Sequence, residues 1–202
     1  MIRAIIFDLW DTIGSKGFAI SKEFRIHFDI PNTPNFLKRY ETAIQLSNWK
    51  KKEDLAKNFL REFKLKQNED NIAYIISVYE KGIKNAKLIE GMEDILRTVH
   101  KQFKLGLISN TTNFEITFID RFKLRELFDV VVSSHEISVL KPSKKIFDEV
   151  VLRLDIPYED CLFIDDSPAN IQQAKIYGLQ GIRFENPLQL REELKKIRIL
   201  NS

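Results

Sequence analysis

The sequence predicts an α/β fold, a Rossmann-like parallel sheet with helices on both faces, into which an α-helical bundle is inserted. Short apolar, β-branched stretches alternate with helical patterns in residues 87–202, which is typical of parallel strands joined by right-handed crossovers. Residues 15–86 instead contain helical patterns and no convincing strand. We therefore expect an α/β core domain of residues 1–14 and 87–202, and a separate helical domain of residues 15–86.

The first strand is expected over residues 2–7, an apolar run that ends in Asp8. Runs of this kind are typical of strands that are buried on both faces of a sheet. Ligands of open α/β sheets bind outside the carboxyl ends of the strands. The sequence therefore places Asp8 where it could meet a substrate or a metal, although an aspartate at a strand end can also serve only as a turn residue or cap.

Amphipathic stretches in the inserted segment predict a series of short helices. Their apolar residues recur at three-four spacing over residues 20–28, 33–46, 53–63 and 71–83. Helices this short bury little surface alone and should pack together as a small bundle. Several aromatic residues of the bundle could line a substrate pocket, although such stripes usually belong to a core: Phe36, Tyr40, Trp49 and Tyr74.

The remainder of the chain alternates between predicted strands and helices. Strands are expected over residues 103–108, 129–133, 161–164 and 180–184. Helices are expected over residues 91–102, from residue 113 onward, and over residues 143–154, 168–177 and 187–199. This order predicts a parallel sheet that is covered on both faces.

Composition and charge exclude several classes of protein. The formal net charge is only +3, and the basic run from Lys50 to Lys52 is followed at once by acidic residues, so no nucleic-acid partner is expected. The single cysteine, Cys161, excludes an internal disulfide and a cysteine-based zinc site. No stretch approaches the ~20 apolar residues of a membrane span, and no signal-peptide pattern is present. We expect a cytoplasmic monomer or homodimer with no membrane partner.

Polar groups follow or flank three further elements that should end at the same sheet edge as Asp8. They are Ser109 and Asn110 after a strand, Lys141 before Pro142 and a helical pattern, and Asp165 and Asp166 after another strand. Together with Asp8, these motifs resemble the haloacid dehalogenase superfamily, a large group of aspartate-nucleophile hydrolases that are mostly phosphatases. The resemblance covers roughly residues 1–13 and 88–185, and it places the helical segment as the cap of the dehalogenase-like branch.

The predicted constellation can perform nucleophilic catalysis. A carboxylate such as Asp8 splits a difficult hydrolysis into two displacements. Lys141 can relieve the charge repulsion between Asp8 and an anionic substrate. Ser109 offers a hydroxyl, and Asn110 an amide, to hold phosphoryl oxygens. We therefore expect Asp8, Lys141 and Ser109 to be catalytic. A small phosphorylated substrate should contact Ser109, Asn110, Lys141 and Trp10.

The adjacent acids Asp165 and Asp166 predict a metal site. They repel each other unless a positive charge lies between them, and Mg²⁺ suits one or two carboxylates together with a substrate phosphate. The resemblance implies that Asp8 also binds this ion and that the backbone carbonyl of Trp10 completes the protein ligands. One of the acids could cap the helix that begins at Ser167 and Pro168, and the two roles can hold at once.

Trp10 departs from the pattern of the family's phosphatases, which read Asp-x-Asp-x-Thr in the first motif. The second aspartate of that motif is the general acid/base, whose loss reduces the rate by about 10²–10⁴. Asp11 lies one residue further on and should point elsewhere if the strand direction persists. The family's dehalogenases carry an aromatic residue at the Trp10 position, because a halide leaves without a proton, and they use no metal.

Three interpretations therefore remain open. The acid pair favours a Mg²⁺-dependent phosphatase that acts on a small phosphorylated metabolite and is suited to good leaving groups such as acyl or aryl phosphates. Trp10 favours a metal-independent 2-haloacid dehalogenase. The third interpretation is a protein that binds phosphoryl groups or metal without turnover, because fold does not fix function.

Overall fold

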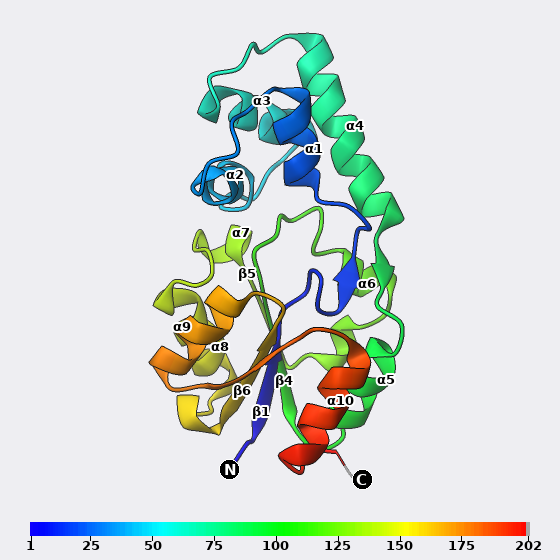
Figure 1. The fold of residues 1–202 in the computed structure, drawn as a ribbon, viewed down its shortest axis with the longest axis vertical. Coiled ribbons are helices and arrows are strands. Elements are labelled where there is room, and N and C mark those ends of the chain that lie inside the picture. Colours follow the sequence, from blue (N-terminus) through cyan, green and yellow to red (C-terminus); the bar gives the residue numbers. More distant parts are fainter. Residues whose placement is uncertain (201–202) are drawn as a thin grey trace.

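A five-stranded parallel sheet forms the centre of the computed structural model, which describes residues 1–200. The strand order is β5-β4-β1-β6-β7, with β1 in the middle (Figure 1). The strands are β1 (Ala4–Phe7), β4 (Lys104–Ser109), β5 (Val130–Ser133), β6 (Cys161–Asp165) and β7 (Gln180–Arg183). All four pairings between them are parallel, so the predicted α/β fold class is confirmed.

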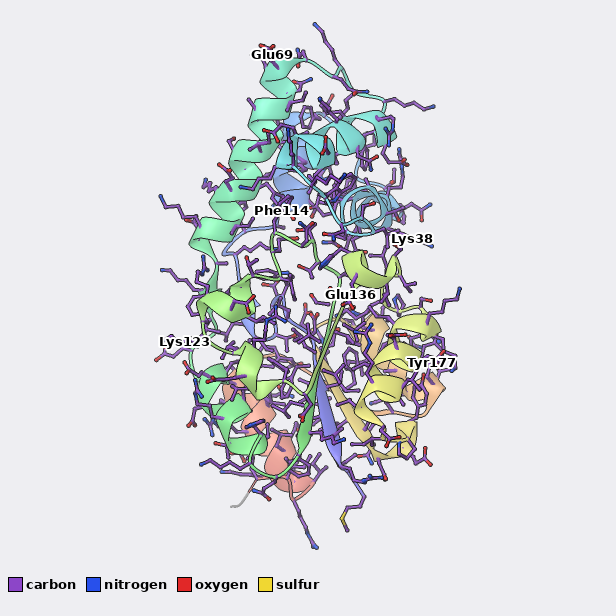
Figure 2. The ribbon with its side chains drawn as sticks, turned by 180° about the vertical axis from the view of Figure 1, so that it is seen from behind. Lys38, Glu69, Phe114, Lys123, Glu136 and Tyr177 are labelled. Atoms are coloured by element: carbon purple, nitrogen blue, oxygen red, sulfur yellow. The ribbon has the colours of Figure 1, made fainter. Side chains whose placement is uncertain are left out.

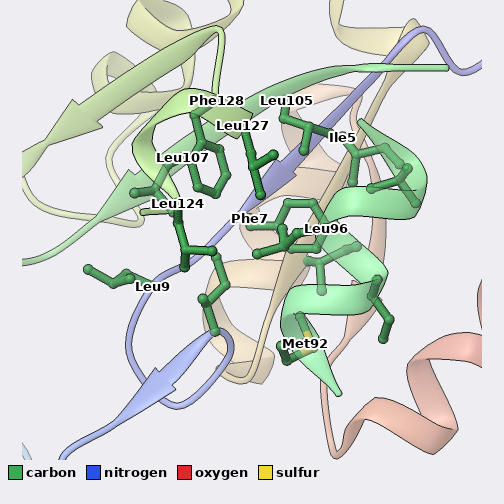
Figure 3. Close-up of a cluster of buried hydrophobic side chains, with 14 of the residues drawn as sticks. Ile5, Phe7, Leu9, Met92, Leu96, Leu105, Leu107, Leu124, Leu127 and Phe128 are labelled. Carbon is green, nitrogen blue, oxygen red and sulfur yellow. The ribbon is translucent and has the colours of Figure 1, made fainter. Parts of the chain in front are cut away.

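Helices cover both faces of this sheet, and each face has its own apolar core. On one face, Ile5 and Phe7 pack with α5 (Met92–Val99) and α10 (Pro187–Lys196). Figure 3 shows Phe7 and Ile5 beside Leu96 of α5 in this cluster. On the other face, Ala4 and Ile6 pack with α8 (Lys144–Leu154) and α9 (Pro168–Tyr177). Alternate residues of β1 thus enter opposite cores, as the unbroken apolar run predicts.

The segment between β1 and the rest of the sheet forms a bundle of four helices, as predicted. They are α1 (Ile20–His27), α2 (Phe36–Ile44), α3 (Lys52–Glu62) and α4 (Glu69–Asn85). The bundle has a separate apolar core that includes Phe24, Phe59 and Tyr79. It lies beyond the carboxyl ends of the strands, at the end of the molecule opposite the N-terminus (Figure 1).

Polar contacts hold the bundle against the sheet. The Asn113 side chain accepts a hydrogen bond from the Trp49 backbone N–H and donates one to its carbonyl, both at 3.0 Å. The hydroxyl of Ser134 donates to the Gln45 carbonyl at 2.7 Å, and that of Ser138 to the Leu46 carbonyl at 3.0 Å. Figure 2 labels Lys38 on α2 and Glu136 on α7 (Ser134–Ile137), and shows α7 directly beneath α2.

Several short elements differ from the predictions. A two-residue strand, β2 (Gly14–Ser15), pairs antiparallel with β3 (Lys87–Leu88), where the chain enters and leaves the bundle. The helix expected from residue 113 is shortened to α6 (Phe118–Arg121), and α7 was not expected. Single turns of 3₁₀-helix occupy Arg125–Leu127 and Tyr158–Asp160. Elements of two to four residues carry too few side chains to show a period.

None of the helices in residues 1–200 is both long and apolar enough to span a membrane.

Candidate active site

Asp8, Ser109 and Asp165 lie at the carboxyl ends of three adjacent strands. Ser109 and Asp165 end β4 and β6, and Asp8 directly follows β1, which pairs with both. The backbone N–H of Asp8 donates to the Ile164 carbonyl at 2.9 Å, which extends the hydrogen-bonded ladder by one residue beyond β1. All three side chains are buried. The structure therefore brings together the groups that the sequence placed at one edge of the sheet.

Lys141 lies between two of these carboxylates. Its ammonium nitrogen is 2.5 Å from Asp8 Oδ1 and 2.7 Å from Asp165 Oδ2, and the lysine itself is buried. The side chain of Asn110 holds the lysine backbone, since its Oδ1 accepts from the Lys141 N–H at 2.7 Å. The peptide bond between Lys141 and Pro142 is cis. Burial alone would lower the pKa of the Lys141 ammonium, but the neighbouring Asp8 and Asp165 outweigh this effect and raise the pKa above its ordinary value.

Three carboxylates lie close together here, and the ammonium of Lys141 contacts two of them. Asp8, Asp165 and Asp166 each offer an oxygen, and these oxygens lie within 4.8 Å of one another. Burial, together with the charges of Asp165 and Asp166, raises the pKa of Asp8 to about 8 despite the opposing effect of Lys141. Burial and the charge of Asp165 also raise the pKa of Asp166. A set of hard oxygen donors with uncompensated negative charge fits a divalent cation such as Mg²⁺.

Asn170 supports Asp165 in this cluster. Its amide nitrogen lies 3.1 Å from Asp165 Oδ1 and 3.0 Å from Oδ2, and the backbone N–H of Ser167 donates to Oδ1 at 2.8 Å. Helix α9 is capped by the Ser167 hydroxyl, which accepts from the Asn170 N–H. The interpretation that an acid of the pair caps this helix is therefore wrong, since Ser167 occupies that position.

The hydroxyl of Ser109 is buried and has no hydrogen-bond partner among residues 1–200. A buried hydroxyl without a partner is unfavourable, and such atoms in folded proteins usually meet a ligand, an ion or a water. A ligand oxygen at the end of β4 would satisfy it. The position of the orphaned hydroxyl thus fits the predicted contact with a phosphoryl group.

Trp10 forms one wall of the pocket above Asp8. Its indole N–H donates to Thr111 Oγ1 at 3.1 Å, and its ring packs edge-on against Phe118. The ammonium of Lys16 lies 3.8 Å from the ring centre. Asp11 was expected to point elsewhere only if the strand direction persisted, and this condition is not met: β1 ends at Phe7, Asp11 has a φ of 58°, and its side chain lines the same pocket.

The pocket has a volume of about 380 Å³ and lies between the sheet edge and the bundle. Asp8, Trp10, Asn110, Lys141 and Asp166 line it from below, whereas α1, α2 and the residue after α2 contribute Ile20, Leu37, Tyr40, Glu41 and Gln45. The aromatic residues of the bundle divide as follows: Tyr40 lines the pocket, and Phe36, Trp49 and Tyr74 pack in or against the bundle core. The stripe is therefore mostly structural.

Two acidic residues near this pocket were not among the predicted site residues: Glu41, which is half-buried, and Glu115, which is buried. Glu41 accepts a hydrogen bond from the Asn110 amide at 3.3 Å, and burial raises its pKa although Asn110 and Lys141 oppose the shift. Glu115 is fully buried and forms an ion pair with Lys16 at 2.5 Å. Nothing in the helical periodicity separates Glu41 from a solvent-exposed glutamate, because its burial depends on the sheet edge beneath α2.

Known proteins resemble the chain in sequence. A family model described as haloacid dehalogenase-like hydrolase matches residues 5–184. A chloroplast flavin mononucleotide hydrolase of Arabidopsis thaliana is 30% identical over 112 residues, which are 55% of this chain and 46% of that protein. A D-ribitol-5-phosphate phosphatase of Bacteroides thetaiotaomicron is 28% identical over 116 residues, 54% of this chain and 55% of that protein. The matches thus span about half the length of these curated relatives.

Solved structures resemble the whole chain in fold. A HAD-like family hydrolase from Porphyromonas gingivalis has a TM-score of 0.67 at 21% identity and covers 98% of both chains. A HAD family enzyme from B. thetaiotaomicron, in complex with magnesium and inorganic phosphate, has a TM-score of 0.64 at 17% identity and covers 92% of this chain and 96% of its own. A 2-haloacid dehalogenase from Pseudomonas syringae has a TM-score of 0.64 at 17% identity, and the match covers 98% of this chain and 100% of that chain.

Proposed function

The chain belongs to the haloacid dehalogenase-like hydrolases, and we propose that it is a Mg²⁺-dependent phosphatase in which Asp8 is the nucleophile. The observation that carries this proposal is the cluster of Asp8, Asp165 and Asp166, of which only Asp8 and Asp165 contact the ammonium of Lys141. Three acids that converge in this way repel one another when ionised, which helps raise the pKa of Asp8 and of Asp166, and a further cation would relieve this repulsion. A dehalogenase that works without metal has no use for such a cluster.

Each residue of the cluster has a separate role in the proposed reaction. The Asp8 carboxylate attacks phosphorus and forms an aspartyl phosphate, which water then hydrolyses. Lys141 neutralises Asp8 and the phosphoryl oxygens, and the Ser109 hydroxyl and Asn110 amide bind those oxygens. Asp8, Asp165, Asp166 and the Trp10 carbonyl would hold Mg²⁺, which supplies charge neutralisation for the phosphoryl group.

The substrate in this proposal is a small phosphorylated molecule enclosed between two domains. Residues 1–14 and 87–202 form the core domain that carries the chemistry, and residues 15–86 form a cap domain that closes the pocket of about 380 Å³. Two relatives named above are described as hydrolases of small phosphorylated compounds, which supports this substrate class. Oligomeric assembly is not needed to complete the site, because its residues all come from one chain.

Trp10 favours a second candidate, a metal-independent 2-haloacid dehalogenase. Its ring cannot act as the acid that phosphatases of the family carry at this position, and a halide needs none. In that reaction Asp8 would attack carbon, Lys141 would assist, and chloride would be released in the presence of EDTA.

Release of inorganic phosphate from acetyl phosphate and p-nitrophenyl phosphate, with Mg²⁺ and with EDTA, tests the proposal. The expected result is release that requires Mg²⁺ and is abolished in Asp8→Asn. Asp54→Asn, an exposed position of α3, is the matched control and should behave as the wild type. Halide release from a 2-haloacid in EDTA, without phosphate release, would replace the phosphatase by the dehalogenase.

A further inference from the structure

A phosphate ester of an alcohol or phenol needs a proton on its leaving oxygen unless the leaving group is a stable anion. Trp10 does not meet this need, because its indole N–H is already donated to Thr111. If the chain is a phosphatase as proposed, the proton must come from another group that lines the pocket.

Most titratable groups of the pocket are committed elsewhere. Asp8 and Asp166 belong to the carboxylate cluster, and Lys141 is held between two carboxylates. Lys16 lies over the Trp10 ring and pairs with Glu115 at 2.5 Å. Burial raises the pKa of the Tyr40 phenol well above its ordinary value, which makes Tyr40 a poor proton donor. Asp11 and Glu41 remain.

Asp11 lies on the metal side of the pocket. Its side chain is exposed and accepts a hydrogen bond from the Ser15 hydroxyl at 2.9 Å. Its charge contributes to the raised pKa of Asp166, one of the proposed metal ligands. The Asp11 carboxylate is thus open to water, and the charged group it influences belongs to the carboxylate cluster.

Glu41 lies on the opposite side, in the roof of the pocket. Its side-chain hydrogen bond among the described residues comes from a neutral amide, that of Asn110, which directly follows Ser109. The carboxyl is mostly withdrawn from solvent, and this burial raises its pKa, which favours the protonated form that an acid requires. An ionised Glu41 would instead repel the phosphoryl group beneath it.

The position of Glu41 is fixed by the end of its own helix. Gln45 directly follows α2, one turn after Glu41, and both line the pocket. The Gln45 and Leu46 carbonyls accept hydrogen bonds from Ser134 and Ser138, in and just after α7. Figure 1 shows α2 above α7 at this junction. Glu41 is therefore held over the sheet edge by contacts with the core.

We propose that Glu41 is the proton donor of this active site and touches the leaving oxygen of the substrate. As Asp8 Oδ attacks phosphorus, the bond to the leaving oxygen breaks, and that oxygen keeps the electron pair and takes the Glu41 proton. Glu41 is then a carboxylate. Water attacks the aspartyl phosphate in the second step and gives its proton to Glu41, which restores the acid and frees Asp8 and inorganic phosphate.

A comparison of leaving groups separates this role from a structural one. Phenyl phosphate and p-nitrophenyl phosphate differ little in shape, but only p-nitrophenolate leaves readily without a proton. Glu41→Gln keeps the size and the hydrogen bonding of the side chain and removes the acid. We expect Glu41→Gln to lower kcat/KM for phenyl phosphate by about 10²-fold and to leave kcat/KM for p-nitrophenyl phosphate nearly unchanged, although kcat can fall for both because Glu41 also accepts the proton of water in the second step. Asp11→Asn is the matched carboxylate-to-amide control and should not change the ratio of the two substrates.

Other outcomes would overturn the role of Glu41. An equal loss of kcat/KM on both substrates in Glu41→Gln would make Glu41 a structural or binding residue, because kcat/KM ends at departure of the leaving group, and unchanged kcat/KM on both would exclude Glu41 as the donor to the leaving oxygen. A selective loss in Asp11→Asn would transfer the role to Asp11. A wild type that turns over p-nitrophenyl phosphate but not phenyl phosphate would remove the role of Glu41 alone. A wild type with no Mg²⁺-dependent release from acetyl phosphate would remove the proposed phosphatase function itself.

Discussion

The ammonium nitrogen of Lys141 lies 2.5 Å from a carboxylate oxygen of Asp8, and both side chains are buried. The same ammonium lies 2.7 Å from Asp165, so one positive charge is divided between two acids with a third, Asp166, nearby. Burial and the neighbouring acids raise the pKa of Asp8 to about 8, so the three carboxylates ionise together readily only when a further cation binds. The chemistry proposed for the chain follows from this imbalance, and so do the predictions below.

Lys141→Met should lower phosphatase turnover strongly. Without the ammonium, Asp8 faces Asp165 across a buried gap, and an incoming phosphoryl group meets no fixed positive charge from the protein. Loss of a preorganised group of this kind lowers kcat by about 10²–10³. Steady-state kinetics on acetyl phosphate measure the effect. Lys144→Met, in the first turn of α8 with an exposed side chain, is the control, and equal activity of the two variants would contradict the role of Lys141.

Asn170→Ala should weaken Mg²⁺ binding and leave the fold intact. Asn170 donates to both oxygens of Asp165 and so fixes the carboxylate that faces the cation. Removal of groups that orient metal ligands lowers metal affinity by about 10–100-fold. Calorimetric titration with MgCl₂ measures this, with Gln172→Ala on the exposed side of α9 as the control. An unchanged affinity in Asn170→Ala would show that Asp165 needs no such support.

Affinity for Mg²⁺ should rise with pH up to about pH 8. Burial and the charges of Asp165 and Asp166 raise the pKa of Asp8 to about 8, so below that pH the cation must displace a proton from Asp8. Above about pH 8, the affinity for Mg²⁺ should no longer change with pH, because Asp8 is then already ionised. Mg²⁺ titrations at several pH values measure the slope, and Asp8→Asn should flatten it. The same affinity at about pH 6 and about pH 8 would contradict the coupling of Asp8 to the metal.

Lys16→Met should destabilise the fold at neutral pH. Burial alone would raise the pKa of Glu115, but the charge and hydrogen bond of Lys16, with hydrogen bonds from Tyr79 and Thr112, hold this pKa below its usual value. Removal of one partner of a buried ion pair lowers the free energy of unfolding by about 3 kcal/mol.

The pH dependence of this loss follows from the direction of the Glu115 shift. A lowered pKa in the folded state stabilises the protein above the unfolded pKa, and this contribution is lost as pH falls through the folded value. The difference in free energy of unfolding between wild type and Lys16→Met should therefore become smaller at acidic pH. Urea unfolding at neutral pH and at about pH 4 measures it, with the exposed Lys22→Met as control. If the difference in free energy of unfolding were the same at both pH values, Glu115 would not be ionised in the folded protein.

The sheet and the nucleophile edge could be predicted because both follow from local sequence. Buried parallel strands require unbroken apolar runs such as the one over β1, and the end of each run marks where polar side chains must gather. The structure therefore places three polar residues at adjacent strand ends, as the sequence indicated: Asp8, Ser109 and Asp165.

The roof of the pocket could not be predicted in the same way. Glu41 lies on an amphipathic helix whose period shows which face packs in the bundle core but not what covers the other face. Asp11 lines the pocket in a turn that follows the end of β1 at Phe7 and has a positive φ at Asp11 itself, and extrapolation along a strand cannot anticipate this turn. The ion pair of Lys16 and Glu115 joins residues that are far apart in sequence and carry no shared motif.

The most direct test of the central claim, that Asp8 is the nucleophile, is mass analysis of protein quenched in acid during turnover of acetyl phosphate with Mg²⁺. The account predicts that the peptide containing Asp8 gains one phosphoryl group, and that neither EDTA-treated protein nor Asp8→Asn shows this gain. Phosphate release with no phosphoryl group on that peptide, or with the group on another residue, would contradict it.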